Sequence, residues 1–113
     1  MKCTIFHNPR CSKSRKTLEL LQEKSVEIDT ILYLEVGVSE NKVLELSKLL
    51  NKPVKNFMRK GEQEYKDLDI DIEDNNACAK AIKLAPKILE RPIVICGDKA
   101  VIGRPPENID LLF

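Results

Sequence analysis

The chain has 113 residues, of which 42% are hydrophobic and 33% are charged, and this length suits one compact domain with one core. Its 19 basic and 18 acidic residues nearly cancel, so net charge does not draw the whole chain to nucleic acid or to an anionic membrane. The N-terminus shows no signal-peptide pattern and no stretch is apolar enough to span a membrane, which predicts a cytoplasmic protein.

The first third of the chain predicts a strand, a helix and a second strand. Residues 2–6 are rich in strand-forming side chains, and the His-Asn-Pro-Arg run at residues 7–10 ends that pattern in a loop. A helix is expected over residues 12–24, because apolar side chains recur there every three to four residues. Residues 27–34 form the second strand, which a crossover helix would place parallel to the first.

The middle third predicts helices. Ser39 is expected to cap a helix that stops before Pro53, because a proline ring cannot continue the hydrogen-bond ladder. A short helix over residues 54–59 and a longer one over residues 77–84 should follow. The polar stretch over residues 62–76 gives no clear pattern.

The last third predicts a β-hairpin and a closing helix. Strands over residues 93–96 and 99–102 flank Gly97-Asp98, where a glycine accepts positive φ at little cost. Residues 106–112 form the closing helix. This order of elements predicts an α/β fold, with a mixed four-stranded sheet flanked by helices and a helical insertion in the middle third.

The four cysteines are spaced irregularly, with neither a CxxC pair nor a histidine cluster. This spacing argues against a disulfide framework and against a structural metal site, so all four thiols are expected to be reduced. Cys3, Cys78 and Cys96 fall in apolar patterns that are typical of packed, inert thiols. Whether Cys78 or Cys96 is reactive stays open.

Cys11 differs from the other three because it stands at the start of a predicted helix, where free N–H groups and the helix dipole favour a thiolate. Lowering a thiol pKa by about two units needs about 2.7 kcal/mol, and a helix end supplies at most about 2 kcal/mol. Nearby positive charge is therefore needed, and His7, Arg10 and Arg15 are close in sequence. The alternatives are a small buried cysteine and, for His7, a strand-end residue bonded to backbone.

Ser14 stands where a CxxC motif would hold its second cysteine, so Cys11 cannot form the usual local disulfide. A resolving thiol must come from glutathione or from a partner protein. This pattern indicates a mixed-disulfide cycle.

Three arginines stand within two residues of a glycine or proline and are candidate oxyanion ligands: Arg59, Arg91 and Arg104. Guanidinium groups hold tetrahedral oxyanions by paired, charge-assisted hydrogen bonds. The sequence does not show that the three converge, and solvated surface charges are the alternative. Pro92 opens a predicted strand, where either a cis or a trans peptide bond is open.

Residues 7–15 resemble the active-site loop of the glutaredoxin-dependent arsenate reductase family, the ArsC and Spx group of thioredoxin-like proteins. Residues 31–34, 58–60, 90–94 and 103–105 also resemble family blocks in their usual order, so the similarity covers nearly the whole chain. The resemblance implies one thioredoxin-like, ArsC-type domain over residues 1–113. The chain ends soon after residue 105, as in a shorter branch of the family.

The resemblance also implies roles for single residues. Cys11 would attack arsenate, and the arginines that would hold the oxyanion are Arg59, Arg91 and Arg104. The residues that would lower the thiol pKa and shape the loop are His7, Asn8, Ser14 and Arg15. Pro92 would be cis. Glutathione and glutaredoxin would supply the electrons to a monomer that binds no metal, no other cofactor, no nucleic acid and no membrane.

Two other functions remain open from the sequence. One is an Spx-like, redox-sensing adaptor that binds RNA polymerase or another partner, although many Spx-like regulators carry a CxxC switch that is absent here. A general glutathione-linked thiol oxidoreductase is the other alternative. The phosphatase-like C-x5-R loop of a different arsenate reductase class is absent, because the residue six positions after Cys11 is Thr17.

Overall fold

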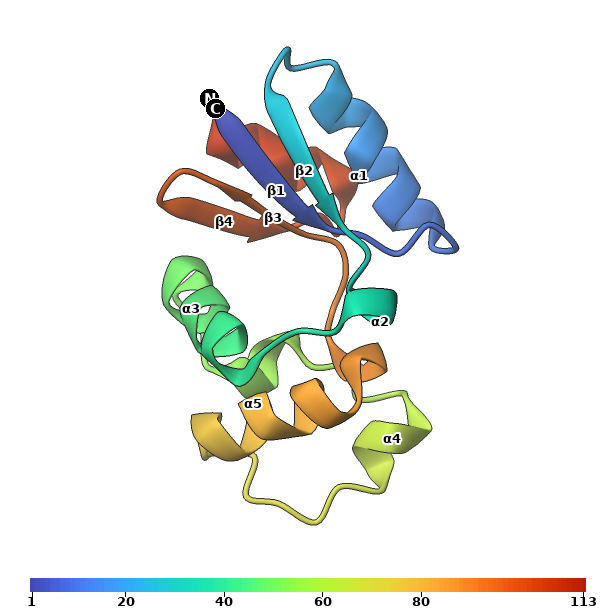
Figure 1. Ribbon diagram of the computed structural model, residues 1–113, viewed down its shortest axis with the longest axis vertical. Helices are drawn as coiled ribbons and strands as arrows, with labels where there is room; N and C mark the ends of the chain where they lie inside the picture. Colours follow the sequence, from blue (N-terminus) through green and yellow to red (C-terminus); the bar gives the residue numbers. More distant parts are fainter. The chain divides into compact units, whose positions relative to one another are not determined.

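The computed structural model describes residues 1–113, which form two compact units (Figure 1). One unit combines Met1–Val36 with Arg91–Phe113 and contains the sheet, and the other is Gly37–Glu90 and is mainly helical. The second unit is the helical insertion that the sequence predicts for the middle third. None of the helices combines the length and the apolar character that crossing a membrane requires.

The sheet of the first unit has four strands in the order β2-β1-β3-β4. The strands are β1 (Lys2–Phe6), β2 (Glu27–Ile31), β3 (Ile93–Cys96) and β4 (Lys99–Ile102). Helix α1 (Ser12–Gln22) connects β1 to β2, which are parallel, whereas β1 with β3 and β3 with β4 are antiparallel. The predicted mixed sheet, its βαβ unit and its hairpin are therefore confirmed, and Gly97 in the hairpin turn has φ +64°.

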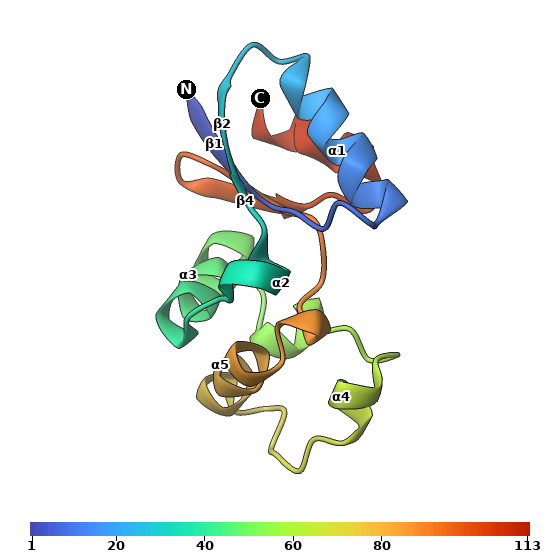
Figure 2. The ribbon, with the colours of Figure 1, turned by 45° about the vertical axis from the view of Figure 1, so that its right-hand side comes forward.

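One face of this sheet carries the core of the first unit. Side chains alternate along a strand, so Cys3 and Ile5 of β1 point to the same face as Val94 and Cys96 of β3. Helix α1 and the 3-10 helix η3 (Pro106–Leu112) lie side by side on one side of the sheet (Figure 2). Leu21 from α1 and Ile109 from η3 are fully buried in the same cluster.

The predicted elements and the observed ones differ most after β2. The expected strand over residues 27–34 ends at Ile31, and a short helix α2 (Tyr33–Val36) follows. Its first turn closes when the N–H groups of Glu35 and Val36 donate to the carbonyl of Leu32. A short run of apolar residues does not separate a buried strand from a helix turn, which explains the error.

The second unit is built around two packed helices, α3 (Glu40–Leu50) and α5 (Asn75–Leu84). Ser39 caps α3 as predicted, because its hydroxyl accepts the N–H of Lys42 at 3.1 Å. The shorter elements of this unit are η1 (Val54–Phe57), α4 (Gln63–Lys66) and η2 (Pro86–Ile88). The short helix expected over residues 54–59 is therefore a 3-10 helix that ends at Phe57.

A disulfide joins Cys3 to Cys96, so the expectation that all four thiols are reduced is wrong for this pair. The two residues lie directly opposite each other in the antiparallel β1–β3 ladder, with their Cα atoms 4.3 Å apart. Both are buried, as expected. The pair is 93 residues apart in sequence, so only the pairing of β1 with β3 brings the sulfurs together.

Candidate active site

Cys11 lies at the N-terminus of α1, just after the loop that follows β1. It is the N-cap residue, in extended conformation, and its carbonyl accepts the N–H of Arg15 at 3.0 Å as the first helical hydrogen bond. Its own N–H donates to the carbonyl of Asn8 at 3.0 Å. The side chain is a free, half-buried thiol, so a small substrate can reach the sulfur.

Side-chain hydrogen bonds fix the loop before Cys11. The side-chain oxygen of Asn8 accepts the N–H of Arg10 at 3.0 Å. The guanidinium of Arg15 donates to the carbonyl of Pro9 at 2.9 Å. Asn8 and Arg15, two of the predicted loop residues, therefore hold the backbone that presents Cys11.

The ring of His7 lies against Ser14, with 2.7 Å between its Nδ1 and the serine Oγ. The same Oγ accepts the N–H of Asn8 at 3.0 Å. Burial lowers the pKa of His7, and the positive charge of Arg15 lowers it further. At neutral pH the imidazole is therefore uncharged, and it braces the loop through Ser14 rather than supplying a cation to the thiol.

Four groups around Cys11 stabilise its thiolate. Burial of the sulfur by itself raises the pKa of the Cys11 thiol, but these four groups outweigh burial and bring the pKa below its ordinary value. In order of effect they are the backbone N–H of Ser14, the guanidinium of Arg91, the backbone N–H of Lys13 and the guanidinium of Arg104. The helix N-terminus and two arginines therefore act together, as a thiolate at this position requires.

The positive charge comes from a different part of the chain than the sequence predicts. Nη1 of Arg104 lies 3.8 Å from Sγ of Cys11 and donates to the carbonyl of Arg91 at 3.4 Å. The antiparallel register pairs Phe6 with Ile93, so the segment before β3 meets the segment after β1. His7, Arg10 and Arg15 are nearer in sequence, but they are not the cations that lower the Cys11 pKa.

The peptide bond between Arg91 and Pro92 is cis, as expected, and so is the bond between Arg104 and Pro105. The third predicted arginine, Arg59, belongs to the second unit. There its guanidinium forms an ion pair with Glu62 at 2.7 Å. The structure thus brings two of the three arginines to Cys11, and a part for Arg59 in the site stays a prediction.

A cavity of about 240 Å³ opens beside the Cys11 loop. Its lining combines the loop before the thiol with the end of β2 and the start of α2: His7, Asn8, Pro9, Arg10, Leu32, Leu34 and Glu35. Cys11 itself is not among the lining residues, so the cavity borders the loop rather than the sulfur.

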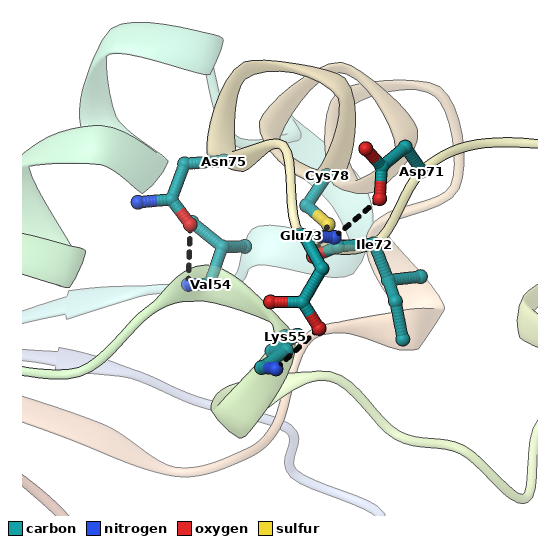
Figure 3. Close-up of polar contacts among 7 residues, drawn as sticks. All are labelled: Val54, Lys55, Asp71, Ile72, Glu73, Asn75 and Cys78. Carbon is teal, nitrogen blue, oxygen red and sulfur yellow. Dashed lines mark hydrogen bonds and ion pairs between the residues drawn. The ribbon is translucent and has the colours of Figure 1, made fainter.

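The other free cysteine, Cys78, lies in the second unit and is fully buried. Its thiol donates to the carbonyl of Ile72 at 3.3 Å, beside the carboxylates of Asp71 and Glu73 (Figure 3). Burial raises the pKa of the Cys78 thiol most, and the nearby carboxylates, led by Asp74, raise it further. The thiol therefore stays protonated at neutral pH, as expected of an inert core cysteine.

Two residues near the site escaped the sequence analysis. Thr17 is fully buried on α1, and its hydroxyl lies 3.2 Å from the carbonyl of Gly103. Asn108 donates to the carbonyl of Arg104 at 3.2 Å. Thr17 could have been found, because it lies three residues after Ser14 and four before Leu21, on the buried face of the helix.

The lowered pKa of Cys11 predicts how its alkylation depends on pH. Because the thiolate is the reactive form, the alkylation rate falls as pH drops through the thiol pKa. For Cys11 we expect this midpoint below that of the same thiol in the unfolded chain, so the thiolate fraction at pH 7 should be larger in the folded protein. Iodoacetamide labelling followed by mass spectrometry measures the midpoint, and an ordinary midpoint in the folded protein would contradict the site described above.

The pattern of the ArsC family matches residues 6–112 of the chain. An arsenate reductase from Haemophilus influenzae is 44% identical over 112 residues, which cover 96% of this chain and 97% of that protein. The uncharacterized protein YfgD of Escherichia coli is 44% identical over 110 residues, covering 93% and 91%. A solved structure of an arsenate reductase from Vibrio cholerae has a TM-score of 0.91 at 37% identity, covering 100% of this chain and 98% of that one.

Proposed function

The chain belongs to the ArsC family, and from that membership we propose that it is an arsenate reductase whose nucleophile is Cys11. One observation carries the proposal: a half-buried thiol at the N-terminus of α1 lies 3.8 Å from the guanidinium of Arg104. The cations that lower the thiol pKa are also the groups that would bind an oxyanion, so one arrangement serves both the nucleophile and its substrate.

In the proposed reaction the Cys11 thiolate attacks arsenic, an arsenic–sulfur bond forms, and one oxygen leaves as water after protonation. Glutathione thiolate then attacks the sulfur of this adduct. A sulfur–sulfur bond forms, and the electron pair of the arsenic–sulfur bond passes to arsenic, which leaves as arsenite. Glutaredoxin reduces the mixed disulfide and restores the Cys11 thiol. The two thiols thus supply the two electrons, and no bound cofactor takes part.

Arg91 and Arg104 are proposed to bind the oxygens of arsenate. Their positive charges attract the negatively charged oxygens of arsenate and stabilise the negative charge that grows on the departing oxygen. Arg59 is proposed as a third ligand. His7, Asn8, Ser14 and Arg15 are proposed to hold the loop so that the thiolate keeps its place at the helix N-terminus.

The proposal assigns residues 1–113 to one functional domain, and the family match over residues 6–112, which spans both units, supports this. It places a monomer in the cytoplasm, where glutathione and glutaredoxin are available. The cavity of about 240 Å³ beside the loop supports the use of a small thiol co-substrate.

A coupled assay with NADPH, glutathione reductase, glutathione and glutaredoxin tests the proposed function. NADPH oxidation should depend on added arsenate. When glutaredoxin is left out and a model mixed disulfide replaces arsenate, this chain should cause no NADPH oxidation. Inactivity on arsenate with glutaredoxin, thioredoxin and free thiols as donors would overturn the proposal. Turnover of the mixed disulfide without arsenate would instead identify a general thiol oxidoreductase.

Arg91→Lys separates charge from geometry in the same assay. Lysine keeps the positive charge but loses the paired hydrogen bonds of the guanidinium, so transition-state binding should weaken by about 1.5 to 3 kcal/mol. This corresponds to a drop in kcat/KM of about 10- to 150-fold. Arg91→Gln should lose more, because it removes the charge as well. Equal kcat/KM for the wild type and the lysine variant would argue against Arg91 as a ligand.

A further inference from the structure

The backbone that carries Arg104 is fixed by four hydrogen bonds. The N–H of Gly103 donates to the carbonyl of Pro92 at 2.9 Å, and the N–H of Arg104 donates to the carbonyl of Ile102 at 2.9 Å. The hydroxyl of Thr17 donates to the carbonyl of Lys13 at 2.8 Å, and the carbonyl of Gly103 shares the same proton at 3.2 Å. The carbonyl of Arg104 accepts from the side-chain amide of Asn108 at 3.2 Å.

Thr17 and Gly103 touch so closely that no larger residue fits at position 103. A Cβ atom on Gly103 would lie 2.6 Å from Oγ1 and 2.8 Å from Cγ2 of Thr17, and 2.9 Å from Cγ of Pro92. Real Cβ atoms essentially never show such distances. The absence of a side chain at position 103 therefore lets the Arg104 segment sit directly against α1, the helix that begins at Cys11.

From this geometry we propose that Thr17 and Gly103 are positioning residues, which hold the guanidinium of Arg104 against the sulfur of Cys11. Thr17 lies on the same helix as Cys11, six residues along it, and Gly103 immediately precedes Arg104. The contact between them thus fixes the distance between the base of the arginine and the helix end that presents the thiol.

The contact between Thr17 and Gly103 matters because the side chain of Arg104 is exposed. An exposed arginine has many rotamers, and ordering them costs up to about 2 kcal/mol. The contacts of its guanidinium with Cys11 and with the carbonyl of Arg91 are long, at 3.8 and 3.4 Å. A small shift of the backbone at position 103 would therefore move the charge away from the sulfur.

The inference deepens the proposed function and depends on it for the part that Arg104 plays, but its test needs no arsenate. The readout is the pKa of Cys11, taken from the pH dependence of iodoacetamide alkylation in the full-length folded protein. Arg104→Gln should raise this pKa by about 1 unit, since it removes a cation beside the sulfur. Gly103→Ala should raise it by about half as much, because the new methyl group pushes the arginine segment off α1.

A double-mutant cycle separates positioning from a general structural effect. In the Arg104→Gln background Gly103→Ala should leave the Cys11 pKa unchanged, because the charge that it would displace is already gone. Thr17→Ala combined with Gly103→Ala should restore part of the pKa, because it removes two of the three close contacts. A rise of equal size in both backgrounds, or no rise in folded Gly103→Ala, would overturn the proposal.

Thr17→Val and Thr17→Ser keep the test decisive if Gly103→Ala does not fold. Valine has the shape of threonine but no hydroxyl, so the carbonyls of Gly103 and Lys13 both lose their bond to residue 17 and the Cys11 pKa should rise. Serine keeps the hydroxyl, and its pKa should stay close to that of the wild type. Circular dichroism confirms the fold of each variant, and equal pKa values for the valine and serine variants would contradict the positioning role of Thr17. If the variants show these pKa shifts but the wild type does not reduce arsenate, the result contradicts the proposed function alone.

Discussion

Replacing Cys11 with serine is expected to abolish arsenate reduction and to lower kcat/KM by at least about 10³-fold. Serine keeps the size of the side chain and the helix N-cap but provides no thiolate. The groups that stabilise negative charge at this position act on a thiol pKa, and a hydroxyl group is too weak an acid to ionise there at neutral pH. Oxygen also cannot form the mixed disulfide through which electrons enter. The coupled arsenate assay measures the loss.

Cys78→Ser is the matched control, because it makes the same change at the other free cysteine. Cys78 is buried in the second unit and has a raised pKa, so the rate should stay within about twofold of the wild type. A serine hydroxyl can still donate to the Ile72 carbonyl. Turnover that persists in Cys11→Ser would show that the nucleophile is not Cys11. Turnover that disappears in folded Cys78→Ser would contradict the inert role of Cys78.

Removing the disulfide between Cys3 and Cys96 is expected to lower the free energy of unfolding by about 2 to 5 kcal/mol. The bond joins positions 93 residues apart, so in the unfolded chain it closes almost the whole sequence into one loop. Urea unfolding of the double variant Cys3→Ala/Cys96→Ala, compared with the oxidised wild type, measures the change. Both variant side chains remain small and apolar, so the strand pairing of β1 with β3 should persist.

A thiol count tests whether the disulfide is present in the wild type. The denatured wild type should show two titratable thiols without reductant and four after reduction. Four thiols before reduction, in protein purified without reductant, would contradict the bond. The pair is buried, so glutathione should reach it only when the sheet opens. Cys78→Ala, which alters no disulfide, is the control for a change in packing.

The sequence determined those features whose causes lie within a few residues. A strand followed by His-Asn-Pro-Arg placed a cysteine at a helix N-terminus, and the structure has Cys11 there as the N-cap. Ser39 and Pro53 bracket α3, and Gly97 marks the hairpin turn, because capping and turn preferences are properties of single residues and their neighbours. The order of these elements was then enough to predict the mixed sheet.

The sequence singled out three arginines and the family resemblance gave them a role, but neither could say how the three are arranged. Arg91 and Arg104 reach Cys11 because β3 pairs antiparallel with β1 and because Gly103 lets its segment touch α1. By contrast, Arg10 and Arg15 are nearer to Cys11 in sequence but do not lower its pKa, and Arg15 bonds to the carbonyl of Pro9 in the loop. Local spacing suggested His7 as a source of charge, whereas burial makes it neutral.

Only the tertiary structure decided the disulfide, the cations beside the thiol and the contact of Thr17 with Gly103. Each joins positions far apart in sequence, such as the 93 residues between Cys3 and Cys96 and the 93 between Cys11 and Arg104. Such pairs depend on strand register, and a shift of one residue would turn every side chain of a strand to the opposite face. Local preferences determine which elements form, and the packing of those elements determines which side chains meet.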